Sequence, residues 1–269
     1  MALARRAAIL GVIALIAIAV AAARDTDADP DGHAAGASTG LLFNGTNKNA
    51  WQDQSATKTR VRKVWNPDGG PGSALRFQAF NADVFPLTPT ANPRAQLVTP
   101  LRVRVGGQFW ESYEVYLPAN FPVAATRDGW VALGSPAYGP PEYGTPPVSL
   151  SIEDGNFRFQ RDGYAAQPWQ IAWQAPLIVG QWVRFTWHVK LSQHGFVQLW
   201  MNDQPIELAN PGTGTSSTTL NMPVIDPGNA RGPWFSQLSV YMKHNSFRSV
   251  TAYFRGFRIA TTQALAEAG

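Results

Sequence analysis

Arginine and histidine supply most of the side chains in this sequence that could bind an anion or move a proton. Seventeen of the 22 basic residues are arginine, and the planar guanidinium suits two-point contact with carboxylates and sulfates. A mildly basic surface that only keeps the protein soluble would have the same composition. The four histidines are His33, His188, His194 and His244, and histidine is the usual proton-transfer group near neutral pH.

Several other chemistries lack the residues that they need. The chain has no cysteine, which excludes thiolate nucleophiles and cysteine-ligated metals. Retaining glycosidases need closely spaced carboxylates on one strand face, whereas Glu111 and Glu114 fall on different sides of their strand. Transition-metal sites need paired histidines, which are also missing. Calcium is a possible cofactor, because Asn44, Asp154 or Asp226 could supply oxygen ligands, although each also stands in an ordinary turn sequence.

The elements that must position these side chains are short β-strands. In residues 183–190 every second side chain is apolar, and the polar ones between them include His188 and Lys190. Alternation with a period of two over many short segments indicates a β-sandwich or barrel. The alternating segments are 109–117, 183–190, 196–201, 238–243 and 250–259.

Turns separate these strands, and they indicate a single domain. The chain has 24 glycines and 21 prolines between its apolar runs. Residues 153–156 and 202–204 have the composition of hairpin turns. We predict one all-β domain over residues 41–262, followed by a tail over residues 263–269, where the only helical stretch is expected.

The first forty residues have the features of an export signal and a linker. Arg5 and Arg6 precede an uncharged apolar run, residues 7–23, that ends in three alanines. This is the layout of a secretory signal peptide, residues 1–23, although a membrane anchor is the rival interpretation. Residues 24–40 are small and polar, as in a flexible linker. We therefore expect a secreted, extracellular protein that is free of the membrane after cleavage. No nucleic-acid motif is present.

Three blocks of sequence resemble one family of enzymes. They are GQFWESYEVYLPANFP (107–122), PLIVGQWVRFTWHVKLSQHGFVQLWMNDQPI (176–206) and SQLSVYMKHNSF (236–247). They resemble polysaccharide lyases of the heparin lyase I and glucuronan lyase type, and the likeness covers residues 43–261. The resemblance implies a concanavalin A-like jelly roll, a β-sandwich of two antiparallel sheets.

The chemistry that the resemblance implies is β-elimination on a uronate sugar. A base removes the proton at C5, an acid protonates the leaving glycosidic oxygen, and a cation or amide neutralises the carboxylate. Tyr241 and Lys243 match the family's Tyr-x-Lys-x-x-x-Tyr strand, but Phe247 replaces its second tyrosine. Arg94 and Gln96 match an Arg-x-Glu-Leu strand, with glutamine in place of glutamate.

The family's Gln-x-His motif is missing after Trp130, so other residues would have to move the protons. Tyr138 and His244 are the candidates for acid and base. Arg94, Gln96, Tyr241 and Lys243 are the candidates for holding substrate, and His188 and Lys190 are further candidates on their strand's polar face. For His188, a hydrogen-bonded structural role is the rival interpretation.

The sequence therefore predicts a secreted, monomeric polysaccharide lyase-like protein that binds an anionic, uronate-containing polysaccharide and could cleave it. The alternative is a non-catalytic carbohydrate-binding module or lectin, which the missing histidine and Phe247 favour. Trp110, Tyr116 and Trp200 alternate away from the aliphatic side of their strands and could stack on sugar rings, although core positions are also open to them. A purely structural envelope protein is a third interpretation.

Overall fold

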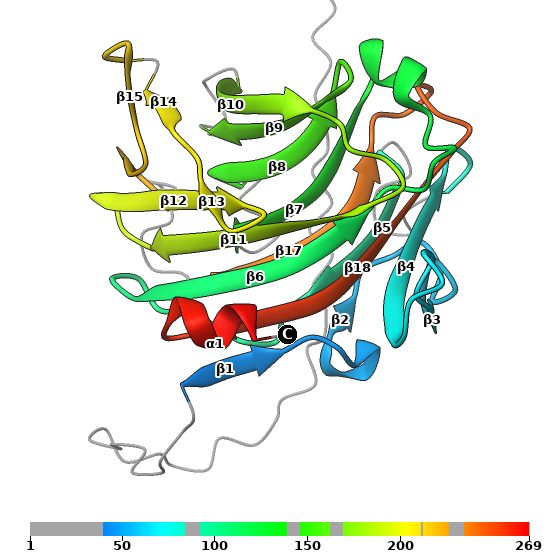
Figure 1. The fold of residues 1–269 in the computed structure, drawn as a ribbon, viewed down its shortest axis with the longest axis horizontal. Helices are drawn as coiled ribbons and strands as arrows, with labels where there is room; N and C mark the ends of the chain where they lie inside the picture. Colours follow the sequence, from blue (N-terminus) through cyan, green and yellow to red (C-terminus); the bar gives the residue numbers. More distant parts are fainter. Residues whose placement is uncertain are drawn as a thin grey trace, which may run out of the picture. The chain divides into compact units, whose positions relative to one another are not determined.

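The computed structural model describes residues 40–83, 92–138, 146–161, 169–210, 212–225 and 234–268. These residues belong to one compact unit, residues 39–269. The unit is nearly all β, with two large antiparallel sheets (Figure 1). The predicted signal peptide and, except for Gly40, the predicted linker lie outside the described residues. No described helix is long and apolar enough to cross a membrane.

Sheet A has nine strands, seven of them in one path. Two more strands pair with members of that path: β1 (Leu41–Asn44) with β18, and β16 (Leu220–Met222) with β12. The path runs β13 (Gln204–Pro205), β12 (Gly195–Met201), β11 (Trp182–Lys190), β6 (Gln108–Tyr116), β18 (Ser249–Ala260), β4 (Ser73–Phe80) and β3 (Val61–Trp65).

Sheet B has seven strands, and a short hairpin and three short helices complete the described secondary structure. The sheet B order is β10 (Gln170–Pro176), β9 (Asn156–Arg161), β8 (Val148–Glu153), β7 (Trp130–Tyr138), β17 (Phe235–Met242), β5 (Arg94–Val98) and β2 (Gln52–Asp53). The remaining elements are β14 (Leu208–Asn210), β15 (Thr215–Ser217), the 3-10 helices η1 (Lys48–Ala50) and η2 (Val123–Arg127), and α1 (Gln263–Glu267).

The hydrophobic core lies between the inner faces of the two sheets. The apolar residues of β11, from Val183 to Val189, are all buried, which confirms the alternation predicted for that segment. The Phe157 ring of β9 lies 5.4 Å from the Phe185 ring of β11, and such edge-on pairs join the sheets. The prediction of an all-β jelly-roll sandwich is confirmed.

Two predicted hairpin turns have the backbone conformation that tight hairpins need. Asp154 and Gly155 have φ values of 52° and 70°, and Asn202 and Asp203 have φ values of 50° and 66°. Positive φ at both central residues is typical of a type I′ turn, which asparagine, aspartate and glycine tolerate best. The helix predicted at the C-terminal end is also present, as α1.

Gly195 fills a position in which a methyl group has no room. A Cβ there would lie 2.2 Å from the Lys190 carbonyl oxygen and 2.9 Å from that of Ser192. We expect Gly195→Ala to lower the free energy of unfolding by about 2–3 kcal/mol, because the backbone must move. Gly212→Ala is the control, since its Cβ would meet only Asn210 Oδ1, at 3.5 Å. Urea unfolding of both variants measures the difference, and equal stabilities would contradict the steric argument.

Candidate active site

Polar side chains cover the outer face of sheet B from β5 to β9. The residues between them, such as Ala95, Leu97 and Val240, point into the core. Because side chains alternate along a strand, the polar residues must face away from the core. We call this surface the polar face of sheet B; it consists of Arg94, Gln96, Ser149, Ser151, Arg158, Gln160, Gln237, Ser239 and Tyr241.

The register of the strands places one residue from each of five neighbouring strands, β5, β17, β7, β8 and β9, in a single row across sheet B. Arg94 of β5 pairs with Tyr241 of β17, which pairs with Ala132 of β7. Ala132 pairs with Ser151 of β8, which pairs with Arg158 of β9. An arginine therefore lies at each end of the row, and between them are Tyr241 and the small side chains of Ala132 and Ser151.

Much of the polar face is buried and internally hydrogen-bonded, although it faces away from the core, whereas Arg94, Arg158, Gln160 and Tyr241 are half-buried. Gln96 is 2% exposed, and its Nε2 donates to Gln54 Oε1 at 2.8 Å. The Ser239 hydroxyl donates to the Ala132 carbonyl oxygen at 2.9 Å. The Ser151 hydroxyl donates to Gln160 Oε1 at 3.0 Å. These bonds fix the side chains in place before any ligand binds.

The densest group of functional side chains lies around Tyr241. The Arg94 guanidinium carbon is 4.7 Å from the centre of the Tyr241 ring, and the Trp130 ring meets the same ring edge-on at 5.2 Å. Asn92 Nδ2 donates to Tyr241 Oη at 3.3 Å, and Asn92 Oδ1 accepts from the His244 backbone N–H at 2.9 Å. The Asn92 amide therefore connects the phenol to the turn that carries His244.

Asn92 and Trp130 are the residues of this group that the sequence did not single out. Asn92 precedes β5 in a proline-rich connection, where no strand pattern could assign its neighbours. Trp130 opens β7, and ten tryptophans offered no means of choosing among them. Their role depends on cross-strand register, which a single strand's sequence does not contain.

Lys243 lies just after β17, at the end of the polar face. Its ammonium group donates to the Asp128 carbonyl oxygen at 2.8 Å, and its side chain is exposed. Lys243 therefore stands near the Arg94 end of the row with its charge open to solvent. His244, the next residue, is also exposed.

The structure does not bring the two predicted proton-transfer residues together. Tyr138 is the last residue of β7, and its backbone pairs with Phe235 at the start of β17. His244 follows the other end of β17, nine residues beyond Phe235. At about 3.3 Å per residue, they lie roughly 30 Å apart along the strands. His244 stands beside the Arg94–Tyr241 end of the polar face, and Tyr138 does not.

His188 and Lys190 belong to the other sheet. Both are on β11, and His188 points to the outer face of sheet A, opposite the inward Trp187. The His188 ring stacks on Trp110 with centres 4.1 Å apart, and its Nδ1 lies 2.7 Å from Gln198 Oε1. This is the hydrogen-bonded structural arrangement that was the rival interpretation for His188. Neither residue joins the group around Tyr241.

Phe247 is buried in the core. It is 4% exposed, and a Cβ added to Gly129 would lie 2.8 Å from its ring. Phe247 therefore lacks the hydroxyl group of the tyrosine that was expected at this position, and its ring is buried rather than exposed on the polar face. The phenolic group that the described polar face does carry is that of Tyr241.

Glu111 and Glu114 lie on opposite sides of β6, as predicted. Glu114 faces outward and accepts from Arg255 Nε at 2.6 Å, whereas Glu111 is fully buried in the core. Neither Glu111 oxygen has a hydrogen-bond partner within the described residues. Burial raises the pKa of Glu111 from 4.5 to about 8.

The described residues contain no cluster of charged metal-ligating side chains. Among them, no three histidine, aspartate or glutamate side chains gather closely enough to bind a metal ion. Asn44 Oδ1 instead accepts from the Thr46 backbone N–H at 3.1 Å, as in an ordinary turn. Asp226 lies outside the described residues.

Solved structures with the same fold include both lyases and hydrolases. An endo-β-1,4-glucuronan lyase from the fungus Trichoderma reesei is 13% identical, with a TM-score of 0.54 over 85% of this chain and 94% of that chain. Alginate lyase A1-II′, of polysaccharide lyase family 7, is 16% identical, with a TM-score of 0.54 over 79% and 93%. The catalytic domain of a glycoside hydrolase family 131 protein from Coprinopsis cinerea is 12% identical, with a TM-score of 0.52 over 79% and 83%.

At these identities the structural likeness shows the jelly-roll fold alone. No curated protein sequence matches the chain significantly. The family-level comparison is more specific, because a model described as polysaccharide lyase matches residues 43–224, which is more than half of the chain. This chain therefore belongs to the polysaccharide lyase family.

Proposed function

We propose that the protein is an exported lyase that binds a uronate-containing polysaccharide on the polar face of sheet B and cleaves it by β-elimination. The observation that carries the proposal is the Arg94–Tyr241 pair, in which a guanidinium and a phenol lie 4.7 Å apart on a preorganised face. The relatives of the same fold that act on glucuronan and alginate support an acidic substrate.

Arg94 would bind the uronate carboxylate. Neutralising that charge makes the C5 proton acidic enough to be removed, and the guanidinium can do so with two parallel hydrogen bonds. Lys243 would add a second cation at the same end of the face. Gln96, whose amide donates to Gln54 Oε1, would contact the sugar without adding a charge to the site.

Tyr241 and His244 would move the protons, with Tyr241 taking the role first given to Tyr138. A base takes the C5 proton, the C4–O bond breaks with its electron pair going to the glycosidic oxygen, and an acid protonates that oxygen. A double bond forms between C4 and C5. Asn92 is bonded both to the Tyr241 phenol and to the His244 backbone, so one amide positions both groups.

Removing the Tyr241 hydroxyl tests its part in this scheme. We expect Tyr241→Phe to lower kcat by about 10²–10⁴-fold, the usual contribution of a positioned acid or base, with KM nearly unchanged. Tyr253→Phe, on the outer face of sheet A, is the matched control. Steady-state kinetics on a cleaved uronate polymer would show both effects, and full activity in Tyr241→Phe would remove Tyr241 from the mechanism.

The wild-type protein should first be given a panel of uronate polymers. Glucuronan, alginate and heparin are incubated with the protein, with and without calcium, and ultraviolet absorbance reports the unsaturated product. A chelated, boiled sample is the control for each polymer. Rising absorbance with at least one polymer supports the proposal, and silence with all of them contradicts it.

A second candidate function is sugar binding without cleavage. Phe247 is buried where the family has a catalytic tyrosine, and the Gln-x-His motif is missing, so the polar face could bind without reacting. Isothermal titration with glucuronan oligosaccharides separates the two functions. Binding with no unsaturated product favours the binding module over the enzyme.

Export is part of the proposal and has its own test. The apolar run of residues 7–23 predicts cleavage before Arg24. N-terminal sequencing of the protein recovered outside the cell should begin at Arg24. Recovery of the intact N-terminus in a membrane fraction would instead support an anchor.

A further inference from the structure

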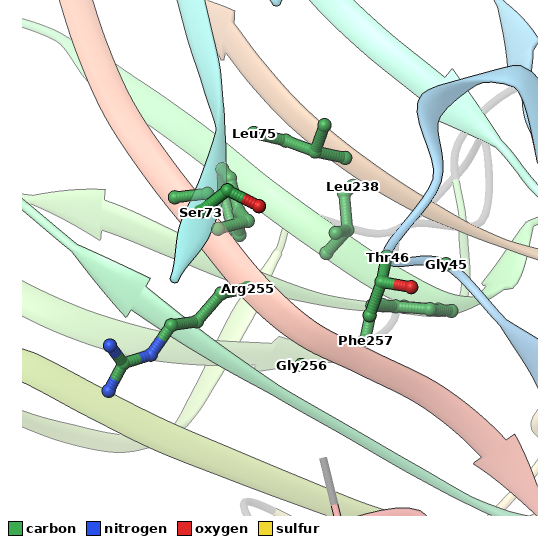
Figure 2. Close-up of a pocket in the computed structure, with 10 residues that line it drawn as sticks. Gly45, Thr46, Ser73, Leu75, Leu238, Arg255, Gly256 and Phe257 are labelled. Carbon is green, nitrogen blue, oxygen red and sulfur yellow. The ribbon is translucent and has the colours of Figure 1, made fainter. Parts of the chain in front are cut away.

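A polar cavity lies on the outer face of sheet A. It has a volume of about 410 Å³ and is lined by β18, β6 and β11 and by the turn between β3 and β4. Arg184, Arg255 and Arg258 contribute its cationic side chains. Figure 2 shows a smaller adjoining pocket that shares Arg255 with the cavity; there the guanidinium points away from the apolar side chains of Leu75, Leu238 and Phe257.

A β-bulge in β18 gathers the arginines on one face. Arg255 pairs with Glu114, and Arg258 pairs with Ser112, so three steps along β18 match two along β6. Gly256, within the bulge, has a φ of 66°, which strains residues with a side chain. Residues three apart on a regular strand face opposite ways, so the bulge is what turns both arginines outward.

The arginines are not equally neutralised. Arg255 Nε donates to Glu114 at 2.6 Å, and Arg184 lies 3.1 Å from Asp203 and 3.9 Å from Glu114. Within the described residues Arg258 forms no ion pair, although it lines the cavity. An anionic group in the cavity would neutralise its charge.

Neutral polar side chains line the rest of the cavity. They are Thr46, Ser73 and Asn66, which lies in the turn between β3 and β4. The complement of this cavity is therefore a ligand with both an anionic acceptor and a neutral hydroxyl donor. An acidic sugar carries a carboxylate and hydroxyl groups on one ring, whereas an inorganic anion such as sulfate has no alcohol group to donate.

Aromatic rings flank the arginines, as sugar binding requires. The Arg255 guanidinium lies 4.1 Å from the Trp182 ring, and Trp182 packs on Tyr116 with centres 5.4 Å apart. Trp182 faces outward on β11, opposite the buried Val183, and is half-buried. A half-buried tryptophan beside the arginines offers a flat surface to a sugar ring.

We propose that this cavity is a second binding site, separate from the polar face of sheet B, for an acidic sugar residue of the polysaccharide. Arg258 binds the carboxylate, Thr46 and Ser73 contact the sugar hydroxyl groups, and Trp182 holds the neighbouring sugar. The site would keep the polymer on the protein while another stretch of it occupies sheet B. The choice of a uronate as ligand rests in part on the proposed function.

The test uses the full-length protein with Arg94→Ala, so that cleavage and binding at the polar face of sheet B are strongly weakened. A glucuronan tetrasaccharide is titrated by calorimetry and by NMR of the Trp182 indole N–H, which donates to Asp68 at 2.9 Å. Cellotetraose, in which a hydroxymethyl group replaces each carboxylate, and inorganic sulfate are the comparison ligands. Arg258→Gln is the test variant, and the exposed Arg104→Gln is its control, both in the Arg94→Ala protein.

We expect the tetrasaccharide to shift the Trp182 signal, and Arg258→Gln to weaken binding at least tenfold while Arg104→Gln leaves it unchanged. Equal binding in the two variants, or no shift, overturns the second site. Cellotetraose binding as tightly overturns the acidic ligand, and sulfate binding as tightly overturns the sugar. None of these results depends on cleavage. They can therefore be interpreted even if the protein does not carry out the proposed reaction.

Discussion

Replacing Glu111 with glutamine is expected to make the protein more stable than the wild type above pH 8, by roughly 4–5 kcal/mol, and equally stable near pH 4. The glutamine has nearly the same shape as the protonated glutamate but cannot ionise. The variant therefore removes one proton equilibrium with little change in the packing around it.

The sign follows from the direction of the pKa shift. Burial raises the pKa of Glu111 from 4.5 to about 8 in the folded protein, so between these values the folded state keeps a proton that the unfolded state has lost. The unfolded state then binds fewer protons, and stability falls as pH rises. The contribution is complete below pH 4.5 and is lost by the time the pH has passed the folded-state pKa.

Urea unfolding of wild type and Glu111→Gln, at half-unit steps from pH 4 to pH 9, measures the difference directly. Other titrating groups affect both proteins alike, so the difference isolates Glu111. A constant difference across this range would mean that the carboxyl is charged or partnered in the folded protein, contrary to its burial.

Arg94→Ala is expected to lower kcat/KM on a uronate polymer by about 10²–10³-fold, comparable with the loss of one oxyanion-stabilising donor elsewhere. Both the binding of the carboxylate and the acidity of the C5 proton depend on this cation in our scheme. The effect should therefore appear in kcat as well as in KM.

Arg104→Ala, an exposed arginine between β5 and β6, controls for the loss of one positive charge. Arg94→Lys keeps the charge but not the two-point geometry, and it should recover only part of the activity. The same thermal unfolding temperature in all three variants would show that the fold is intact. Turnover of Arg94→Ala within threefold of wild type would remove Arg94 from the carboxylate site.

The strands could be predicted from the sequence because each one contains its own pattern. In β11 the apolar residues alternate over eight positions, and the hairpin between β8 and β9 has an Asp-Gly turn that fixes its conformation. The outward orientation of Arg94 and Tyr241 follows from the same alternation. Their pairing was expected only from a family motif.

The assembly of the site could not be predicted, because it depends on which strands pair. His188 and Tyr241 both stand in clearly alternating strands, yet β11 belongs to sheet A and β17 to sheet B. Tyr138 lies beside the start of β17, and His244 follows its end. Only the pairing of β7 with β17 shows this separation, and the alternation within each strand does not contain it. Asn92 comes from a connection between strands, whose course depends on tertiary contacts.

Glu111 shows a different limit. Alternation alone places it on the inward face of β6, beside Phe109 and Tyr113. A charged residue there would normally count against the strand assignment, since buried charges are costly. The structure keeps the strand, and the raised pKa leaves the carboxyl neutral at moderate pH.

The most direct test of the lyase assignment is to cleave a uronate polymer in water enriched in oxygen-18 and to weigh the products. Hydrolysis adds one solvent oxygen to each break, whereas β-elimination adds none and leaves an unsaturated end. We predict products without the heavy isotope, each new non-reducing end lighter by one water than its hydrolytic counterpart. Products carrying oxygen-18 would place the protein with the hydrolases that share its fold and would contradict the account.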